Sequence, residues 1–489
     1  MHPETAGLAF GAGRSISWPP GVLPPLHDVC SVTRYTKPDW FDSIPENFNH
    51  FRGDKPVEEV QCIIPDMVGM SRGKAMPCEK FSPDTIYYLP DSLFYQTITG
   101  EYVEIDQIEN QWMEKDIALH PDMSTACAAP WAEDVTLQVI CDLKTRSGEL
   151  VEVAPRNVLK RVISLYKEQG WRPVVAPELE FYLTKPNLDP NEPVEPPIGR
   201  TGRSASGRQS FSMVAVDEYG PVIDTIYDFA EAQGLNIDTM IQEGGAGQIE
   251  LNLLHGDPLL LADEVFYFKR AIREAALKHN IFATFMAKPM RDEPGSAMHI
   301  HQSVVDIDTG ANIFSDKTGG ISSSFLHFIG GSQKHLLDVM PLLAPYANSY
   351  RRLNGRMSAP GNVEWSKDNR TTGLRIPICE PEARRVENRI IGIDTNPYLA
   401  IAASLAAGYL GMVNKVDPRP EATNEVWREG SVLPDGLAAA LASFEVASDI
   451  RAVLGERFCT VFAAIKNAEL TEFRREISPW EREHLMLNV

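Results

Sequence analysis

Several stretches of the chain alternate between apolar and polar side chains, the pattern of a β-strand with one buried face. Across residues 295–303, Met298 and Ile300 fall on one side of the predicted strand. His299 and His301 fall on the other side. A single histidine on a strand is usually a structural residue. Two imidazoles on one face indicate a metal or phosphate site instead.

The same pattern recurs in residues 174–183, 247–253 and 385–390, which we predict as three further strands. Their polar sides carry Glu178, Glu180, Glu250, Asn252, Arg385, Glu387 and Arg389. If these strands lie side by side, the carboxylates repel one another unless cations lie between them. Oxygen-rich sites with one imidazole suit Mg²⁺ or Mn²⁺, and arginines suit a bound phosphate or carboxylate. The alternative, for any one strand alone, is a solvated charged face with scattered ion pairs.

The spacing of hydrophobic residues along the chain changes near residue 150, from that of strands to that of helices. Before it, short strand-like runs between turn residues predict a small β-rich domain. These runs span residues 59–64, 101–105 and 135–143. After it, helical periodicity appears between the strands, with Pro155 suited to a first helical turn. The predicted helices span residues 154–166, 221–233 and 258–279, most of 326–353, and the tail from residue 437.

Residues 1–50 contain Gly and Pro clusters and little periodicity, so we expect an irregular N-terminal extension there. A β domain over residues 51–150 and a larger domain over residues 151–489 are expected to follow. With 489 residues the chain can bury a large core. The mixture of segregated strands and helices predicts an α+β fold.

Charge and cysteine usage narrow the class of partner and the compartment. The formal net charge is −21, which argues against nucleic acid or an anionic membrane as the main partner. The 7 cysteines are scattered and form no Cys-x-x-Cys motif, which favours a reducing cytoplasm. No signal peptide is evident. The apolar run over residues 397–413 is rich in Ala and Gly and is expected to be a buried helix.

Seven segments together resemble the glutamine synthetase superfamily. They are residues 177–182, 243–250, 295–303, 348–353, 368–377, 384–389 and 396–398. One such segment is weak support, but all of them occur in the family's order over about the last two-thirds of the chain. The resemblance implies an N-terminal β-grasp domain followed by a catalytic domain with a curved antiparallel sheet and helices. It also implies a homo-oligomeric double ring, a dodecamer, with active sites between subunits.

The resemblance also implies roles for individual residues. Two divalent metals, Mg²⁺ or Mn²⁺, are expected in each site. Their ligands would be Glu180, Glu243 and Glu250 for one ion and Glu178, His299 and Glu387 for the other. The residues expected near ATP are His301, Ser303, Arg370, Arg375 and Arg385. Those expected to hold L-glutamate are Gly295, Arg352 and Arg389. Those expected to take part in catalysis are Arg352, Arg370 and Ser358.

The activity implied by the resemblance is a two-step ligation. ATP phosphorylates the γ-carboxylate of glutamate, and an amine then displaces phosphate. Phosphoryl transfer depends mainly on positioning and on neutralising charge. Metal ions that bridge the phosphate oxygens, and arginines that meet developing charge, supply both.

Two departures from the family pattern concern the amine. Glutamine synthetases have a flap Glu before an Ala-Pro pair, but here Ser358 precedes Ala359. Their Asp-Gly-Ser-Ser loop is also missing, and residues 89–100 are its expected counterpart. Because an ammonium site needs closely placed anions, these losses favour a larger organic amine. The alternative is that Glu364 or Asp91 replaces the lost acid.

Three further segments, residues 66–74, 285–295 and 362–365, resemble the γ-glutamylpolyamine synthetase branch of the family. The expected reaction therefore joins glutamate to a polyamine, alkylamine or arylamine, in amine catabolism. A true glutamine synthetase that uses ammonia is the first alternative. A non-catalytic structural or regulatory member of the family is the second, and it is disfavoured because every expected metal ligand is retained.

Overall fold

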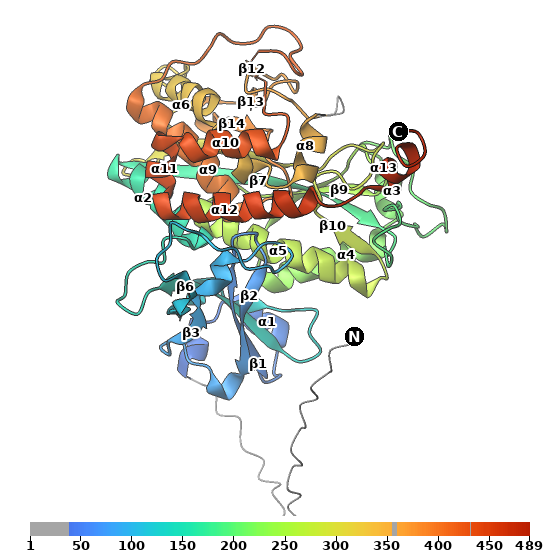
Figure 1. Ribbon diagram of the computed structural model, residues 1–489. Coiled ribbons are helices and arrows are strands. Elements are labelled where there is room, and N and C mark those ends of the chain that lie inside the picture. Colours follow the sequence, from blue (N-terminus) through green and yellow to red (C-terminus); the bar gives the residue numbers. More distant parts are fainter. Residues whose placement is uncertain (1–38, 355–358, 431) are drawn as a thin grey trace, which may run out of the picture. The chain divides into compact units, whose positions relative to one another are not determined.

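The computed structural model of the chain describes residues 39–354, 359–430 and 432–489 (Figure 1). Ser358 and the first 38 residues of the expected extension therefore lie outside the described residues. Residues 39–50, which were expected to be irregular, instead fall mostly within the 3-10 helix η1 (Asp39–Ser43) and the helix α1 (Glu46–Arg52). The two helices bury Phe41 and Phe48, and α1 packs against helix α4 and strand β5, whose bounds follow. Burial of these two aromatic side chains stabilises helices in a stretch whose Gly- and Pro-rich surroundings predict no regular structure.

A six-stranded sheet forms the β domain (Figure 1). Its strands are β1 (Glu59–Pro65), β2 (Ser71–Pro77), β3 (Tyr87–Pro90), β4 (Asp116–Pro121), β5 (Cys127–Ala128) and β6 (Thr136–Lys144). The order is β2-β1-β6-β4-β3, with β5 paired to β6. The β1–β6 pair is parallel and the other pairs are antiparallel. The predicted strands at residues 59–64 and 135–143 are confirmed.

The predicted strand at residues 101–105 is wrong. Tyr102 makes only an isolated bridge with Gln96. The Gln111 side chain takes the bonds that a neighbouring strand would make, because it accepts from the Ile105 amide at 2.8 Å and donates to the Val103 carbonyl at 2.6 Å. A side chain several residues away thus satisfies the backbone that a local pattern assigns to a sheet.

An eight-stranded sheet forms the centre of the larger domain. Its strands are β7 (Trp171–Thr184), β8 (Ile237–Gln242), β9 (Gln248–Leu253), β10 (Phe282–Thr284), β11 (Met298–Asp306), β12 (Trp365–Lys367), β13 (Leu374–Ile376) and β14 (Val386–Asn388). The order is β12-β13-β14-β11-β7-β9-β8, with β10 paired to β7. Every pairing is antiparallel except β12–β13, which is parallel, so the sheet is mixed at one edge.

The register of this sheet brings the predicted polar faces together. His299 on β11 lies opposite Glu178 on β7. Glu178 in turn lies opposite Asn252 on β9, and Glu180 lies opposite Glu250. On its other side, β11 pairs with β14. The expectation that these strands are neighbours is therefore confirmed, although β14 is shorter than predicted.

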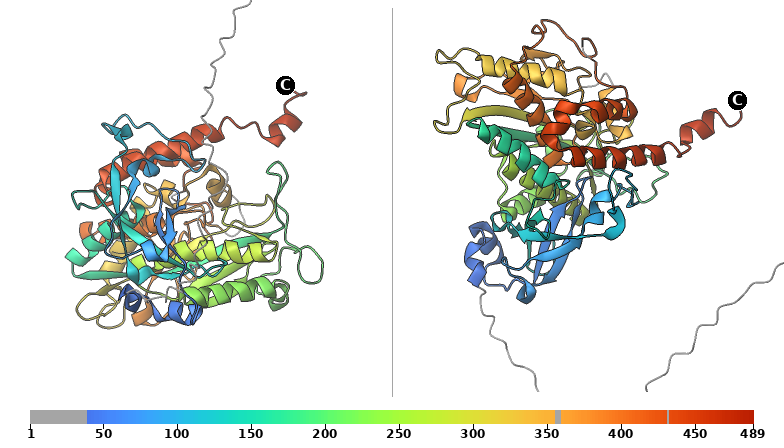
Figure 2. Two further views of the ribbon diagram at one scale, coloured as in Figure 1. Left: turned by 90° about the horizontal axis from the view of Figure 1, so that it is seen from below. Right: turned by 60° about the vertical axis from the view of Figure 1, so that its left-hand side comes forward.

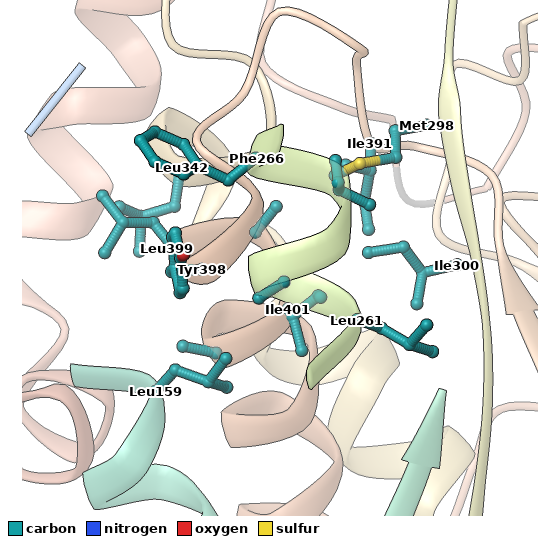
Figure 3. Packing of buried hydrophobic residues seen from close by; sticks show 14 of the residues in the cluster. Leu159, Leu261, Phe266, Met298, Ile300, Leu342, Ile391, Tyr398, Leu399 and Ile401 are labelled. Carbon is teal, nitrogen blue, oxygen red and sulfur yellow. The ribbon is translucent and has the colours of Figure 1, made fainter. Parts of the chain in front are cut away.

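Helices cover the opposite, apolar face of the sheet. The main ones are α2 (Pro155–Glu168), α5 (Pro258–Lys278) and α9 (Pro397–Asn414). Figure 3 shows Met298 and Ile300 of β11 on the side of Leu261 from α5 and Ile401 from α9, and all four are buried. In the described part of the chain, α9 alone is long and apolar enough to cross a membrane. However, 89% of its 18-residue window is buried, so it is a core helix, as predicted.

The remaining helices lie around this core. They are α3 (Met213–Asp217), α4 (Gly220–Gln233), α6 (Ser323–His335), α7 (Met340–Leu343), α8 (Ala347–Leu353), α10 (Leu437–Val446), α11 (Ser448–Leu454), α12 (Glu456–Phe473) and α13 (Pro479–His484). Short 3-10 turns are η2 (Cys78–Lys80), η3 (Asp91–Tyr95), η4 (Gln111–Met113), η5 (Met123–Thr125) and η6 (Pro381–Ala383). Figure 2 shows α12 leading outward to α13.

Arg156 joins the β domain to the larger domain. Its buried guanidinium, in the first turn of α2, donates to both carboxylate oxygens of Asp263 on α5, at 2.9 and 2.8 Å. It also binds Asp122 at 2.8 Å and Asp142, both of which belong to the β domain. The Tyr398 hydroxyl donates to Asp263 at 2.6 Å. Five N–H groups in a fixed plane allow one side chain to bridge these elements.

Replacing Arg156 with Met is expected to destabilise the fold, because Asp263 is then buried without a counter-ion. Removing one partner of a buried ion pair costs about 3–5 kcal/mol. The urea concentration at the midpoint of unfolding measures this loss. The control is Arg146→Met, which removes the exposed ion pair with Asp116 and should leave the midpoint nearly unchanged. Equal midpoints for the two variants would contradict the role of Arg156.

Candidate active site

The polar face of the large sheet gathers carboxylates and imidazoles from several strands. They are Glu178 and Glu180 of β7, Glu250 of β9, His299 and His301 of β11, Glu387 of β14, and Glu243 in the β8–β9 turn. Because side chains alternate along a strand, this face can carry only polar groups while the other face stays apolar. All seven were predicted from the sequence, and the sheet brings together the six that lie on its strands.

His299 lies at the centre of the cluster. Its Nδ1 is 3.2 Å from an oxygen of Glu178, and 3.9 Å from an oxygen of both Glu180 and Glu387. His301 Nε2 lies 2.8 Å from the other oxygen of Glu178. These are the distances of ligand atoms that can converge on a small ion.

Two sets of three ligand atoms lie within 4.8 Å of one another. One set comes from Glu178, Glu250 and His299, and the other from Glu178, His301 and Glu387. Both sets combine carboxylate oxygens with one imidazole, which is the donor chemistry of a site for Mg²⁺ or Mn²⁺. The residues therefore fit the divalent ions that the sequence predicts.

Three of the glutamates resist ionisation. Burial, and then the charges of Glu243 and Glu250, raise the pKa of Glu180 well above its usual range. Burial, and then Glu178 and Glu243, raise the pKa of Glu250 to about 8. Burial also raises the pKa of Glu243. Burial is the largest cause of all three shifts, and the charges of neighbouring carboxylates add to it.

Two other acids are already paired. Burial opposes ionisation of Glu178, but hydrogen bonds with His299 and His301 outweigh it and hold the Glu178 pKa below its usual range. Burial likewise opposes ionisation of Glu387, but Arg389 and then His299 hold its pKa at about 2. Burial and the charge of Arg389 lower the pKa of His299 to about 4. His299 is therefore neutral near pH 7, the form that binds metals.

Two arginines at the edge of the cluster each have an N–H donor that makes no hydrogen bond among the described residues. Arg375 binds Glu387 at 2.8 Å and Asp368 at 2.6 Å, and Arg389 also binds Glu387. The Nε atoms of Arg375 and Arg389 are buried and have no hydrogen-bond partner among the described residues. A buried donor without a partner is costly, so both atoms are suited to an anion that enters the site.

Gly295 and Arg352 pack against each other, as their predicted shared role requires. A Cβ atom added at Gly295 would lie 2.5 Å from Cγ of Arg352 and 2.7 Å from the Ala287 carbonyl oxygen, so no other residue fits there. The Arg352 guanidinium is buried and donates to the carbonyls of Ile390 at 2.7 Å and Arg389 at 2.8 Å. In this structure Arg352 thus holds the segment that follows β14.

Three of the five residues predicted near ATP, namely His301, Ser303 and Arg385, line a cavity beside the metal-ligand cluster. This front cavity has a volume of about 510 Å³, and Glu178, His301, Ser303 and Arg385 are in its wall. Arg385 Nε lies 3.2 Å from His301 Nδ1. Arg375 is not in this wall but binds Glu387 as described. Arg370 is exposed, and its charge lowers the pKa of Glu243 against the larger effect of burial.

Sequence reasoning missed several residues at the site. Asp238 and His255 also line the front cavity. The Arg208 amide donates to the Gly244 carbonyl at 2.8 Å, next to Glu243. Arg208 belongs to the loop over residues 185–210, which lies between β7 and α3. No local alternation marks these positions, because a loop approaches the cluster through contacts far apart in the sequence.

Comparison with known proteins agrees with this geometry. The model of the glutamine synthetase catalytic domain matches residues 152–485. The gamma-glutamylputrescine synthetase PuuA of Escherichia coli (strain K12) is 35% identical over 442 residues, which are 88% of this chain and 92% of that protein. A glutamate–isopropylamine ligase of a Pseudomonas species is 32% identical over 75% of this chain and 80% of its own length. The glutamine synthetase of Halobacterium salinarum (strain ATCC 700922 / JCM 11081 / NRC-1) is 30% identical over 79% and 87% of the two chains.

Solved structures extend the likeness to the whole fold. GmaS without ligand superposes with a TM-score of 0.76 at 25% identity, over 90% of this chain and 98% of that one. Its ADP complex gives a TM-score of 0.75, also at 25% identity, over 90% and 99%. The chain therefore belongs to the glutamine synthetase family of ATP-dependent ligases, which join glutamate to an amine.

Proposed function

We propose that the protein joins the γ-carboxylate of glutamate to an organic amine, through a γ-glutamyl phosphate intermediate, in amine catabolism. The acceptor would be a polyamine, an alkylamine or an arylamine. The observation that carries this proposal is that the carboxylate of Glu364, the nearest acid in the sequence to the flap position, is already bound by other side chains. Relatives named for putrescine and for isopropylamine support the same acceptor class.

Glu364 is occupied by other partners. It is buried, and Arg419 donates to one of its oxygens at 3.0 Å and to the other at 3.4 Å. Gln333 donates to that second oxygen at 3.3 Å. A carboxylate bound by a guanidinium and an amide is poorly suited to bind an ammonium ion as well. The loss of the flap Glu is therefore not compensated by Glu364.

Asp91 is the second acid that could replace the missing charge. It lies on η3, in the wall of a cavity of about 680 Å³ in the β domain, and no residue of 89–100 lines the front cavity of the same subunit. We therefore propose that this segment acts on the catalytic domain of a neighbouring subunit. That arrangement accords with the homo-oligomeric double ring, a dodecamer, expected from the family resemblance.

We propose that Glu180, Glu243 and Glu250 hold one divalent metal, and that Glu178, His299 and Glu387 hold the second. The raised pKa values of Glu180 and Glu250 support this role, because a bound cation would offset both the burial of these carboxyl groups and the charges of their neighbours. When bound, Mg²⁺ or Mn²⁺ neutralises phosphate charge. His301 also lies within reach of Glu178 and Glu387.

The arginines of the chain would perform the remaining neutralisation. The free Nε atoms of Arg375 and Arg389 can donate to phosphate or carboxylate oxygens. Arg352 would orient the glutamate subsite through its bonds to the carbonyls of residues 389 and 390. Such groups accelerate phosphoryl transfer because they are positioned before charge develops.

A cytoplasmic location belongs to this proposal. The six described cysteines are all free, and five of them are buried. Buried thiols without partners are typical of proteins in a reducing compartment. The acceptor amine and ATP would both be available there.

An amine panel tests the proposed acceptor class. Phosphate release by the purified protein with ATP, Mg²⁺ and glutamate should be strong with one of putrescine, spermidine, ethanolamine, isopropylamine or aniline, and weak with ammonia. Fastest release with ammonia would instead indicate a true glutamine synthetase. No release with any amine, despite ATP binding, would favour the non-catalytic alternative.

Replacing Glu243 with Ala is expected to reduce phosphate release by roughly a hundred- to a thousand-fold, because the metal ion that it would hold, which neutralises phosphate charge, loses a ligand. The control is Glu195→Ala, which removes an exposed ion pair with Lys185 in the 185–210 loop and should leave the rate unchanged. Unchanged release by the Glu243 variant would refute its assignment as a metal ligand.

Metal binding should tighten as the pH rises towards 8. A raised carboxyl pKa means that Glu250 favours the folded apoprotein most below its usual value of 4.5, and that this contribution is lost as the pH rises to about 8. A metal ion must displace that proton, so affinity should rise by up to about tenfold per pH unit. Titration with Mn²⁺, followed by electron paramagnetic resonance at several pH values, measures this slope. Glu250→Gln should bind more weakly with a smaller slope, and a flat profile for the unaltered protein would contradict the prediction.

A further inference from the structure

A second large cavity lies behind the sheet, between the β domain and the larger domain. This junction cavity has a volume of about 620 Å³. Its walls come from the β1–β2 turn and Ile98 on one side, and from α5, the end of β10, the start of α8 and residues 394–397 on the other. In Figure 1, α5 runs along the side of the larger domain that faces the β domain. None of its lining residues lines the front cavity.

Positive charge exceeds negative charge in this wall. One face of α5 contributes Lys269, Arg270 and Arg273, whereas Asp394 is the one carboxylate among the residues of the wall. The Asp394 carboxylate accepts from the Ser349 hydroxyl at 2.6 Å. Like charges at such spacing on a helix repel one another unless an anion lies between them.

The three cations differ in what they bind. Lys269 donates to the carbonyls of Ile393 at 2.6 Å and Thr395 at 3.2 Å. Arg270 donates to two glutamine oxygens of the β domain, at 2.8 and 3.2 Å. Arg273 lies 4.8 Å over the ring of Phe285 and has no hydrogen-bond or ion-pair partner among the described residues. Its donors are therefore free to bind a ligand.

The rest of the wall is apolar and adaptable. Met70, Ile98 and Met286 are exposed by 40%, 43% and 42%, which is unusual for such side chains. Methionine side chains adjust to ligands of different shape. A cavity with a free guanidinium and flexible apolar walls suits a small anion that carries an apolar body.

We propose that the junction cavity is a regulatory site for a small organic carboxylate with an apolar or aromatic body. The carboxylate binds Arg273, and the body packs against Met70, Ile98 and Met286. The site shares no lining residue with the front cavity of the same subunit, and Ile98 connects it to the 89–100 segment proposed to act on a neighbouring subunit. The proposal does not depend on which amine is the acceptor.

The cavity is connected to the active site through its own walls. Residues 287–295 follow Met286 and end at Gly295. Helix α8 contributes Asn348 of its first turn to the cavity wall and carries Arg352 in its last turn. The Ile393 amide donates to the Ser296 carbonyl, next to Gly295, while Lys269 holds the Ile393 carbonyl. A ligand that moves any of these segments changes the glutamate subsite.

Titration calorimetry on the purified full-length protein tests the proposal, with benzoate as the probe and benzyl alcohol as its uncharged counterpart. Saturating glutamate and Mg²⁺ keep the active site occupied. Benzoate should bind and benzyl alcohol should not. Arg273→Gln should weaken binding by roughly tenfold to a hundredfold, as expected for loss of a charged hydrogen bond. Arg273→Lys should restore part of it.

Two further variants make the result decisive. Met286→Asp adds a carboxylate that repels the probe or pairs with Arg273, so it should also abolish binding. Lys317→Gln removes a cation outside the junction cavity and should bind benzoate as the unaltered protein does. Benzoate should also change the rate of phosphate release in the unaltered protein and not in Arg273→Gln. Absent binding, or equal binding with and without Arg273, would overturn the proposal.

Discussion

Repulsion between carboxylates on one face of a sheet is the constraint on which this structure depends. Strands β7, β9 and β11 pair in a register that sets glutamates opposite one another and opposite histidine. Burial first, and then the charges of Glu178 and Glu243, raise the pKa of Glu250 to about 8. The apolar packing of α2, α5 and α9 behind the sheet keeps the strands together against that repulsion.

Local alternation predicted much of this arrangement. The period of two along residues 174–183, 247–253 and 295–303 is enough to place Glu178, Glu250 and His299 on polar faces, because side chains alternate in any strand. The order in which these strands pair was not predicted from the sequence. Where a side chain took the hydrogen bonds of a neighbouring strand, the local pattern was misleading, as at residues 101–105 with Gln111.

Other features had no local signal at all. Glu364 could be weighed as a possible ammonium ligand from the sequence, but its pairing with Arg419 joins residues 55 positions apart. The approach of Arg208 to the Glu243 turn is equally non-local. The bridging of three aspartates by Arg156 depends on how two domains meet. Such contacts follow from tertiary packing, which no periodicity within a segment encodes.

The junction between the domains links these observations. Asn396 caps α9 through the amides of Tyr398 and Leu399, and its amide donates to the Asp66 carbonyl in the β1–β2 turn at 2.9 Å. The same turn lines the junction cavity, and residues 389–396 connect the glutamate subsite to this cap. The position of the β domain and the geometry beside Arg389 are therefore held by one continuous segment. Hydrogen bonds of this segment, in addition to the sheet, therefore connect the β domain to the residues beside Arg389.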